Sequence, residues 1–278
     1  MRNRNWTRLL VLLCAATAVV SARAATTSSV ISFSSLDPHQ SYALHGTLYL
    51  PDNTQERHPA VIVLHGTLGI DSRNDLYRDS LLKAGIATFE VDFKSGVYTG
   101  VLSRPRPPAF LPMAFAALKE LRKQPAIAPD SIAIMGFSLG GHTAIDTAFE
   151  ANRKAWMGEE RGFAAHVAFY PVCKPYLEQQ DLKMTGAPVI ILYGTEDSYG
   201  EGSNVPAFRQ LLEQRTGFNV TTVEYAGALH DFNHNAPAET HWDPVAIGHR
   251  ARTGWNADAA NDSVTQVVSF LRKKLNAQ

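Results

Sequence analysis

Short runs of apolar, often β-branched residues recur along the chain and alternate with segments of helical periodicity. Several runs are apolar at consecutive positions, as expected of strands that are covered on both faces of a parallel sheet. The expected strands are 60–64, 86–91, 131–135, 166–170, 188–193 and 220–225, and the expected helices are 76–84, 112–123, 139–151, 205–216 and 262–275. This alternation predicts an α/β fold with right-handed crossovers and helices on both faces of the sheet.

Two further apolar runs, over 30–36 and 44–50, lie close together in the chain and predict a leading antiparallel hairpin. Two long stretches, 94–111 and 231–261, match neither a helical nor a strand pattern. Long irregular segments in a compact domain are usually functional loops or disorder, and ligands of α/β sheets bind at the carboxyl ends of strands, where such loops emerge. We expect one domain over residues 25–278.

The first 24 residues have the pattern of a secretory signal peptide. Arginines in the first eight residues precede an apolar or small stretch over 9–20, and Ala22-Arg23-Ala24 offers small residues at the two positions that a signal peptidase reads. The stretch is shorter than the roughly 20 residues that span a bilayer, and no later run is long enough either. We therefore expect cleavage near Ala24, a secreted or periplasmic product, and no membrane span.

Charge and composition narrow the function classes further. The whole chain is 45% hydrophobic with 26 basic and 26 acidic residues, but four arginines lie in the first 24 residues, which contain no acid. The remainder is therefore mildly acidic and has no electrostatic footprint for a nucleic acid partner. After signal cleavage Cys173 is the only cysteine, so no internal disulfide is possible. A lone thiol after a strand is more often packed in the core than used as a nucleophile.

The strongest chemical signal is the sequence Gly136-Phe137-Ser138-Leu139-Gly140-Gly141. It follows the expected strand 131–135 and precedes a helical pattern, which is the context that a G-x-S-x-G nucleophile turn requires. A serine on such a sharp turn adopts a strained backbone, and neighbours without a Cβ relieve the crowding. A plain glycine-rich turn does not account for this context, so Ser138 is the candidate nucleophile.

A serine hydroxyl needs a base to take its proton, and a histidine base needs a carboxylate to orient it. In folds with this nucleophile turn the order along the chain is serine, acid, histidine. The sequence GTED ends at Asp197 after one expected strand, and the sequence AGALH ends at His230 after the next. Both residues are therefore expected at the same sheet edge as Ser138. Glu196 and Asp231 are lower-ranked candidates for the acid, and the alternative for each is a solvated loop charge.

Ester cleavage also needs two backbone N–H donors for the oxyanion. One is expected from Leu139, directly after the candidate nucleophile. The other is expected from the loop after the strand 60–64, which reads His65-Gly66-Thr67-Leu68-Gly69. We select Thr67 as this second donor, with Leu68 as the alternative. His65 itself is interpreted as a structural hydrogen-bonding residue rather than a base.

The motifs HGTLG, GFSLGG, GTEDS and HDF resemble, in spacing and order, those of the dienelactone hydrolase family of α/β-hydrolases. The similarity extends over roughly residues 42–275. It implies an α/β-hydrolase fold with a mainly parallel, eight-stranded sheet, no large lid domain, and hydrolysis of an ester or lactone. It also implies Ser138, Asp197 and His230 as the catalytic triad.

The chain departs from the founding enzymes of that family at two positions. They carry Cys where Ser138 stands and Glu where Gly66 stands, and that Glu belongs to the machinery that activates the thiol. The two departures together are consistent with an ordinary serine hydrolase and argue against dienelactone itself as the substrate. Arg104 and Arg106 are candidates for the arginines that bind the substrate carboxylate in the family, and the alternative is solvated loop charges.

No cofactor and no metal are expected. His230 and His234 have the H-x-x-x-H spacing of zinc ligands on a helix, but the segment around them is not expected to be helical. His234, His241 and His249 are candidates to line the site as part of the stretch 231–261, and the alternative for each is a surface position. Four aromatic residues are candidates for pocket walls, namely Tyr193, Tyr199, Trp242 and Trp255.

The expected function is hydrolysis of a small-molecule carboxylic ester or lactone through an acyl-enzyme on Ser138. Only seventeen residues lie between Tyr170 and Pro188, which leaves little room for a lid and favours an open site. Two alternatives remain open. One is a peptidase or acyltransferase that uses the same residues, and the other is a non-catalytic binding protein that keeps the fold.

Overall fold

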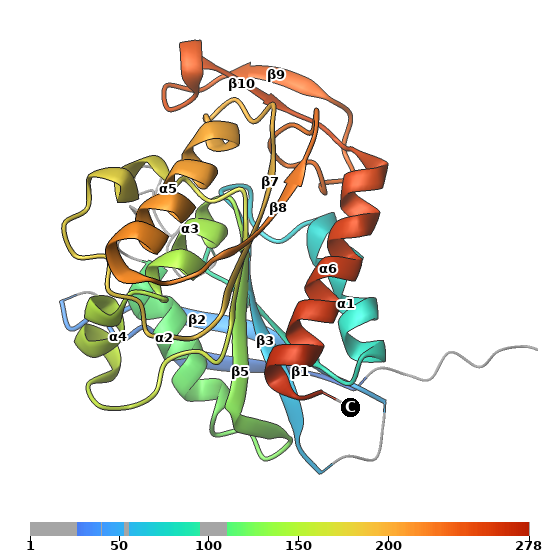
Figure 1. Cartoon of the computed structure of the whole chain (residues 1–278). Coiled ribbons are helices and arrows are strands. Elements are labelled where there is room, and N and C mark those ends of the chain that lie inside the picture. The colour runs from blue at the N-terminus through green and yellow to red at the C-terminus, as the bar shows by residue number, and fades with distance from the viewer. Residues whose placement is uncertain (1–26, 40, 53–55, 95–109, 278) are drawn as a thin grey trace, which may run out of the picture.

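The computed structural model describes residues 27–39, 41–52, 56–94 and 110–277. The expected signal peptide and the candidates Arg104 and Arg106 lie outside these ranges. An eight-stranded sheet runs through the centre of the molecule in the order β1-β2-β4-β3-β5-β6-β7-β8 (Figure 1). Its strands are β1 (Thr27–Ser34), β2 (Ala43–Leu50), β3 (His58–Leu64), β4 (Ala87–Asp92), β5 (Ile127–Phe137), β6 (His166–Phe169), β7 (Val189–Gly194) and β8 (Thr221–Tyr225).

The pairing of the strands is antiparallel at one side of the sheet and parallel elsewhere. β1 and β2 form the expected antiparallel hairpin, and β2 also runs antiparallel to β4. All neighbours from β4 through β3 and β5 to β8 are parallel. This mainly parallel sheet confirms the predicted α/β-hydrolase fold class.

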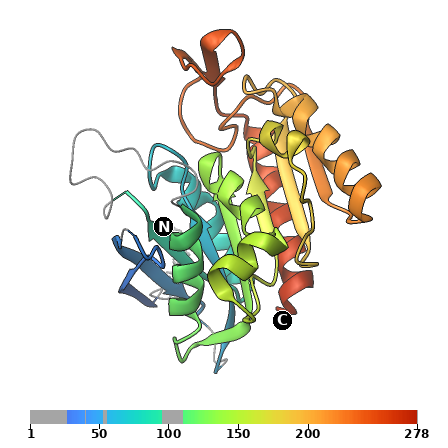
Figure 2. The same ribbon diagram turned by 90° about the vertical axis from the view of Figure 1, so that its left-hand side faces the viewer.

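Helices cover both faces of the sheet (Figures 1 and 2). On one face lie α1 (Ser72–Lys83) and α6 (Ala257–Leu275), and on the other lie α2 (Phe110–Leu121), α3 (Leu139–Asp146), α4 (Glu150–Met157) and α5 (Glu201–Thr216). Along β3, Val61 and Val63 pack with the α1 and α6 side chains, whereas Ile62 packs with those of α2. Each face of β3 is therefore apolar, which is why residues 60–64 are hydrophobic without interruption. None of the described helices is long and apolar enough to cross a membrane.

The single helix expected over 139–151 is instead two helices, α3 and α4. The chain leaves the helical path between them because its backbone pairs with the segment that precedes β7. The N–H of Glu150 donates to the Lys183 carbonyl (2.8 Å), and the N–H of Thr185 donates to the Ala148 carbonyl (2.9 Å). These long-range bonds replace intrahelical ones, so the local pattern could not reveal the break.

The stretch 231–261 was expected to be irregular, but part of it is regular. β9 (Glu239–Trp242) pairs antiparallel with β10 (Arg250–Thr253), apart from the main sheet and beyond one end of its strands (Figures 1 and 2). All four β9 residues are exposed, so no alternation of apolar and polar positions marks the strand. The connection also contains a short 3-10 helix, η3 (Ile247–His249), and another, η2 (Lys174–Glu178), follows β6. α6 begins earlier than expected because the Asn256 side chain caps it, accepting from the N–H of Ala259 (3.1 Å).

Candidate active site

Ser138 lies on a sharp turn between β5 and α3. Its backbone has φ 51° and ψ −109°, a conformation that few L-residues adopt. Glycines make the turn possible. A Cβ on Gly136 would lie 2.2 Å from the Gly140 carbonyl carbon, and a Cβ on Gly140 would lie 2.4 Å from the Leu64 oxygen. The turn presents a half-buried Ser138 at the carboxyl end of the strand.

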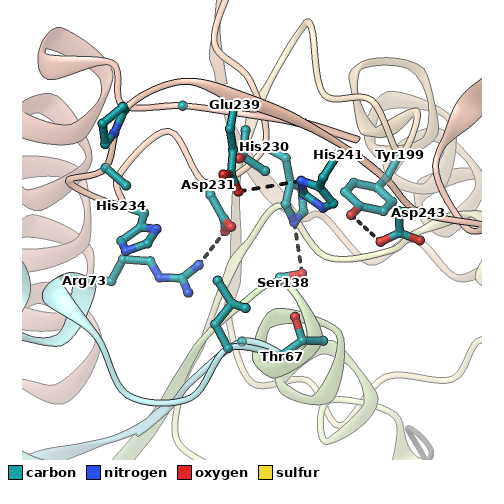
Figure 3. Close-up of a pocket in the computed structure, with 16 residues that line it drawn as sticks. Thr67, Arg73, Ser138, Tyr199, His230, Asp231, His234, Glu239, His241 and Asp243 are labelled. Atoms are coloured by element: carbon teal, nitrogen blue, oxygen red, sulfur yellow. Dashed lines mark hydrogen bonds and ion pairs between the residues drawn. The ribbon is translucent and has the colours of Figure 1, made fainter. Parts of the chain in front are cut away.

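His230 links Ser138 to Asp197 through two hydrogen bonds. The Nε2 atom of His230 lies 3.0 Å from the Ser138 Oγ (Figure 3), and its Nδ1 atom lies 2.7 Å from the Asp197 Oδ2. When Nδ1–H donates to the carboxylate, Nε2 is left to accept the serine proton. The three side chains, called the triad from here on, therefore have the geometry of a nucleophile, a base and an orienting acid.

Burial and charge act in opposite directions on His230. Burial lowers the pKa of the imidazole, but the charge of Asp197 and the hydrogen bond to it raise the pKa by more, and Asp231 adds to the rise. The pKa of His230 is therefore raised above its ordinary value. The site thus favours the imidazolium that forms when the ring takes a proton from Ser138.

Asp197, rather than the neighbouring Glu196, faces the imidazole. The Asp197 side chain is fully buried, and its second oxygen accepts a hydrogen bond from the N–H of Tyr199 (2.8 Å). Glu196 is largely exposed and forms an ion pair with Arg252 (3.5 Å). Two donors hold the Asp197 carboxylate in place, and these are the Nδ1–H of His230 and the Tyr199 N–H.

Arg73 is a buried cation beside the triad that sequence reasoning missed. It is 1% exposed, and its guanidinium binds the Asp71 carboxylate (2.5 Å) and the Asp231 carboxylate. Asp231 is therefore a buried partner in an ion pair, and its interpretation as a solvated loop charge was wrong. Burial lowers the pKa of Arg73, but Tyr170 and the two carboxylates outweigh burial and raise it, so the group stays charged. No local signal reveals this pair, because 158 positions separate its members.

Gly66 lies beside the guanidinium of Arg73. A Cβ on Gly66 would lie 3.4 Å from the Nη2 of Arg73 and 3.3 Å from the Phe137 oxygen. A side chain at this position would therefore begin in contact with the guanidinium.

The two candidate oxyanion donors flank the nucleophile. Leu139 is the first residue of α3, directly after Ser138, and Thr67 lines the same cavity from the turn after β3. Leu68, the alternative donor, also lines the cavity, and its side chain is exposed. His65 is buried, and its Nε2 accepts from a backbone N–H just after β4 (3.1 Å), in keeping with a structural role.

The triad opens into a cavity of about 500 Å³ (Figure 3). Its walls come from the turn after β3, from α1, from the loops that follow β5, β7 and β8, and from the segment that contains β9 and β10. Of the candidate histidines, His234 and His241 line the cavity. His249 lies outside the lining, with its Nδ1 3.1 Å from the Pro244 carbonyl.

Two tyrosine rings contact the imidazole of His230. The ring centroids of Tyr170 and Tyr199 lie 4.5 and 4.6 Å from the imidazole centroid. Tyr199 lines the cavity, as expected of a pocket wall, whereas Trp242 is 73% exposed and outside the lining. Tyr170 follows β6 and was not recognised from the sequence. The two rings restrict the orientations that the base can adopt.

Within the described ranges, no group of three or more His, Cys, Asp or Glu side chains is placed to hold a metal ion. His230 and His234 lie on a turn rather than a helix, so their spacing does not bring them to one helical face. The chemistry that the arrangement offers is base-assisted attack of the Ser138 hydroxyl on a carbonyl carbon.

Comparisons with known proteins identify the family and the fold. Residues 44–275 match the family model described as the dienelactone hydrolase family. No curated protein matches the sequence at a significant level.

Three solved structures illustrate the likeness of the fold. A dienelactone hydrolase-like promiscuous phosphotriesterase from metagenomic libraries has 19% identity, covers 89% of this chain and 98% of its own, and gives a TM-score of 0.63. Thermogutta terrifontis esterase 2 phosphorylated by paraoxon has 18% identity, with coverages of 88% and 94% and a TM-score of 0.63. A putative dienelactone hydrolase from Klebsiella pneumoniae has 17% identity, with coverages of 89% and 99% and a TM-score of 0.61.

Proposed function

The chain belongs to the dienelactone hydrolase family and is a hydrolase that acts on ester bonds, and from this premise we propose that it is an exported serine esterase with Ser138 as its nucleophile. Its substrates are small-molecule carboxylic esters or lactones. The observation that carries the proposal is the unbroken hydrogen-bonded chain from Asp197 through His230 to Ser138, opening into a cavity. A binding protein without turnover has no need of all three groups in this order.

The first half of the reaction forms the acyl-enzyme. His230 takes the proton of Ser138 as the serine oxygen bonds to the ester carbonyl carbon, and Asp197 stabilises the resulting imidazolium. The backbone N–H groups of Leu139 and Thr67 stabilise the negative charge on the carbonyl oxygen, and loss of one such donor typically costs about 3 kcal/mol. When the intermediate collapses, His230 gives its proton to the departing alcohol.

The second half returns the serine. His230 removes a proton from a water molecule, whose oxygen bonds to the acyl carbon. Collapse of this second intermediate breaks the bond to Ser138, and the serine oxygen recovers its proton from His230. The products are one carboxylic acid and one alcohol, or a single hydroxy acid when the substrate is a lactone.

Turnover of an ester and lactone panel tests the proposal directly. We expect the wild-type protein to hydrolyse members of the panel, and we expect Ser138→Ala to keep its circular dichroism spectrum and lose turnover. Faster cleavage of amides, or acyl transfer to an added alcohol that outcompetes water, would select the peptidase or the acyltransferase instead.

Covalent labelling tests the role of Ser138 independently of the natural substrate. One of the similar structures is an esterase phosphorylated by paraoxon. We expect paraoxon to lose its nitrophenolate to the attack of Ser138 and to leave one diethyl phosphoryl group per chain, seen by intact-protein mass spectrometry. The adduct should be absent from Ser138→Ala. A folded wild-type protein that gains no adduct and turns over no ester would be a binding module.

Export is the second part of the proposal and has its own experiment. The pattern of residues 1–24 supports it, with basic, apolar and small-residue regions in the order of a signal peptide. Expression of the whole chain in a Gram-negative host should place the protein in the periplasm or the medium, with Ala25 as its first residue by N-terminal sequencing. A cytoplasmic product that retains residues 1–24 would contradict export and leave the proposed chemistry untouched.

A further inference from the structure

The segment of residues 236–254, called the β9–β10 segment from here on, makes one wall of the cavity that contains Ser138. Figure 3 shows Glu239, His241 and Asp243 reaching toward the cavity from this segment. Residues alternate between the two sides of a strand, and Trp242, between two of these side chains, lies outside the lining and is 73% exposed. One side of β9 therefore faces whatever ester is bound at Ser138.

Hydrogen bonds hold the β9–β10 segment against the loop that carries the catalytic acid. The Tyr199 hydroxyl donates to the Asp243 carboxylate (2.8 Å). The Ser198 carbonyl accepts from the N–H of Ile247 (2.8 Å), and the Ser198 hydroxyl oxygen accepts from the N–H of Arg252 (2.9 Å). Because Ser198 and Tyr199 follow the catalytic acid directly in the chain, the wall and the triad are held together by one loop.

The charges on the cavity wall do not balance. Among the described residues that line the cavity, one arginine, Arg73, faces three carboxylates, those of Asp231, Glu239 and Asp243, so with neutral histidines the lining has a net charge of −2. The β9–β10 segment supplies two of the three carboxylates, whereas its two arginines, Arg250 and Arg252, pair in register with Trp242 and Thr240 and lie outside the lining. The guanidinium of Arg73 pairs with Asp231, so the net charge of −2 corresponds to the two carboxylates of this segment.

Groups just behind the lining add to the negative charge. Asp71 also binds Arg73 (2.5 Å), and Asp197 lies behind the imidazole. Lys94 also lies behind the lining, where its Nζ donates to the Leu68 carbonyl (2.8 Å) and contributes one positive charge, so these three groups add a net charge of −1. An anionic substrate would therefore enter a cavity whose described side chains repel it.

We propose that the β9–β10 segment is a specificity element that makes the active site select neutral and cationic esters over esters or lactones that carry a carboxylate. The inference rests on the proposed ester hydrolysis and names the charge class of its substrate. Glu239 is the principal specificity-determining residue, because its carboxylate lines the cavity and its partner, His241 at 3.6 Å, neutralises it only when protonated.

The expected size of the effect is modest and depends on salt. Two negative charges at about 10 Å from a substrate charge, in a water-like dielectric, change kcat/KM by roughly threefold for each unit of substrate charge at low ionic strength. A cationic ester should thus be favoured over an anionic one by about tenfold. At about 1 M salt the Debye length falls to about 3 Å, so most of the preference should disappear.

The test uses 4-nitrophenyl esters whose acyl chains have matched length and end in a trimethylammonium, a tert-butyl or a carboxylate group. A second series carries the same three end groups on the alcohol, because either part of the ester can face the β9–β10 segment. Values of kcat/KM are measured at about pH 8, above the ordinary range of histidine titration, at low and at high salt. In at least one series we expect kcat/KM to be highest for the cationic ester, lower for the neutral ester and lowest for the anionic ester. The differences in kcat/KM should become smaller at high salt.

Two variants assign the effect to the cavity wall. Glu239→Gln removes one of the two net charges of the lining and should reduce the ratio of cationic to anionic kcat/KM about threefold. Glu213→Gln is the matched control, because it makes the same change at an exposed position of α5 outside the cavity. It should leave the ratio unchanged.

The outcomes separate this inference from the function on which it rests. Esters that are hydrolysed without charge preference in both series, or with the anionic ester favoured, would overturn the inference and leave the esterase proposal standing. A preference that Glu239→Gln does not reduce, or that Glu213→Gln reduces equally, would overturn the assignment to the β9–β10 segment. Failure to hydrolyse any of the six esters would refute the proposed function itself.

Discussion

Replacing Asp231 with Asn removes one carboxylate from the buried cluster beside the triad. The side chains of Arg73 and Asp231 are only 2% and 13% exposed, so the pair is largely out of water. Removing one partner of a buried ion pair costs about 3–5 kcal/mol, because the other charge is left uncompensated. Arg73 retains Asp71, whose side chain is 17% exposed, and we therefore expect a smaller loss of about 2–3 kcal/mol in the free energy of unfolding.

Asparagine is the appropriate replacement because of the backbone at this position. Asp231 has φ 57°, in the left-handed region, which Asn tolerates better than other residues with a Cβ. Asp231→Asn therefore reports the loss of charge, whereas Asp231→Ala should cost about 1 kcal/mol more through backbone strain. The difference between the two variants separates the ion pair from the turn.

Urea unfolding followed by tryptophan fluorescence measures these changes. Asp75→Asn is the matched control, because Asp75 also pairs with an arginine, Arg78 at 2.7 Å, but its side chain is 72% exposed. An exposed pair contributes about 0.3–0.5 kcal/mol, so the control should change stability by no more than that. If Asp231→Asn costs no more than Asp75→Asn, the buried ion pair does not stabilise the fold and our account of Arg73 is wrong.

Three further predictions concern the triad and the lone thiol. Asp197→Asn should lower kcat by about 10⁴-fold with an unchanged circular dichroism spectrum, because the imidazole loses the partner that fixes its tautomer. A decrease in kcat of less than tenfold would show that Asp197 is not part of the triad. The pKa of His230 is raised from 6.5, and only the neutral ring can act as a base. The value of kcat/KM should therefore fall with decreasing pH, with a midpoint above 6.5. A pH profile that stays flat below pH 6.5 would argue against His230 as the base. Cys173 is buried, and burial raises the pKa of its thiol, so the native protein should react with iodoacetamide far more slowly than protein unfolded in urea. Mass spectrometry measures both rates of alkylation, and equal rates would refute the burial of Cys173 in the core.

The convergence of the triad could be anticipated because it depends on local patterns. Ser138 and Asp197 follow short runs of apolar residues, which are typical of parallel strands buried on both faces, and His230 follows a β-branched run that ends at Tyr225. Parallel strands point their carboxyl ends to one edge, so residues that follow them meet there. Gly136 is likewise required locally, since a Cβ there would lie 2.2 Å from the Gly140 carbonyl carbon, whereas Gly140 is required by its contact with Leu64 of β3.

The surroundings of the triad could not be anticipated in this way. Arg73 looks like an ordinary helix residue two positions after a capping Asp71, and only the folded chain brings Asp231 to it. β9 has no apolar face to mark it, and its position follows from pairing with β10, whose Arg252 N–H donates to the Ser198 hydroxyl oxygen. Tyr170 meets the imidazole because β6 ends beside β5 and β7.

The succession of strands and helices, the nucleophile turn and the order of the catalytic groups along the chain are thus encoded in short stretches of sequence, because local residue patterns indicate the backbone conformation there. The charge of the cavity, the pairing of Arg73 and the wall that faces the substrate arise from contacts between distant segments. Electrostatic and hydrogen-bond energies depend on distance and burial, and neither quantity exists until the chain has folded.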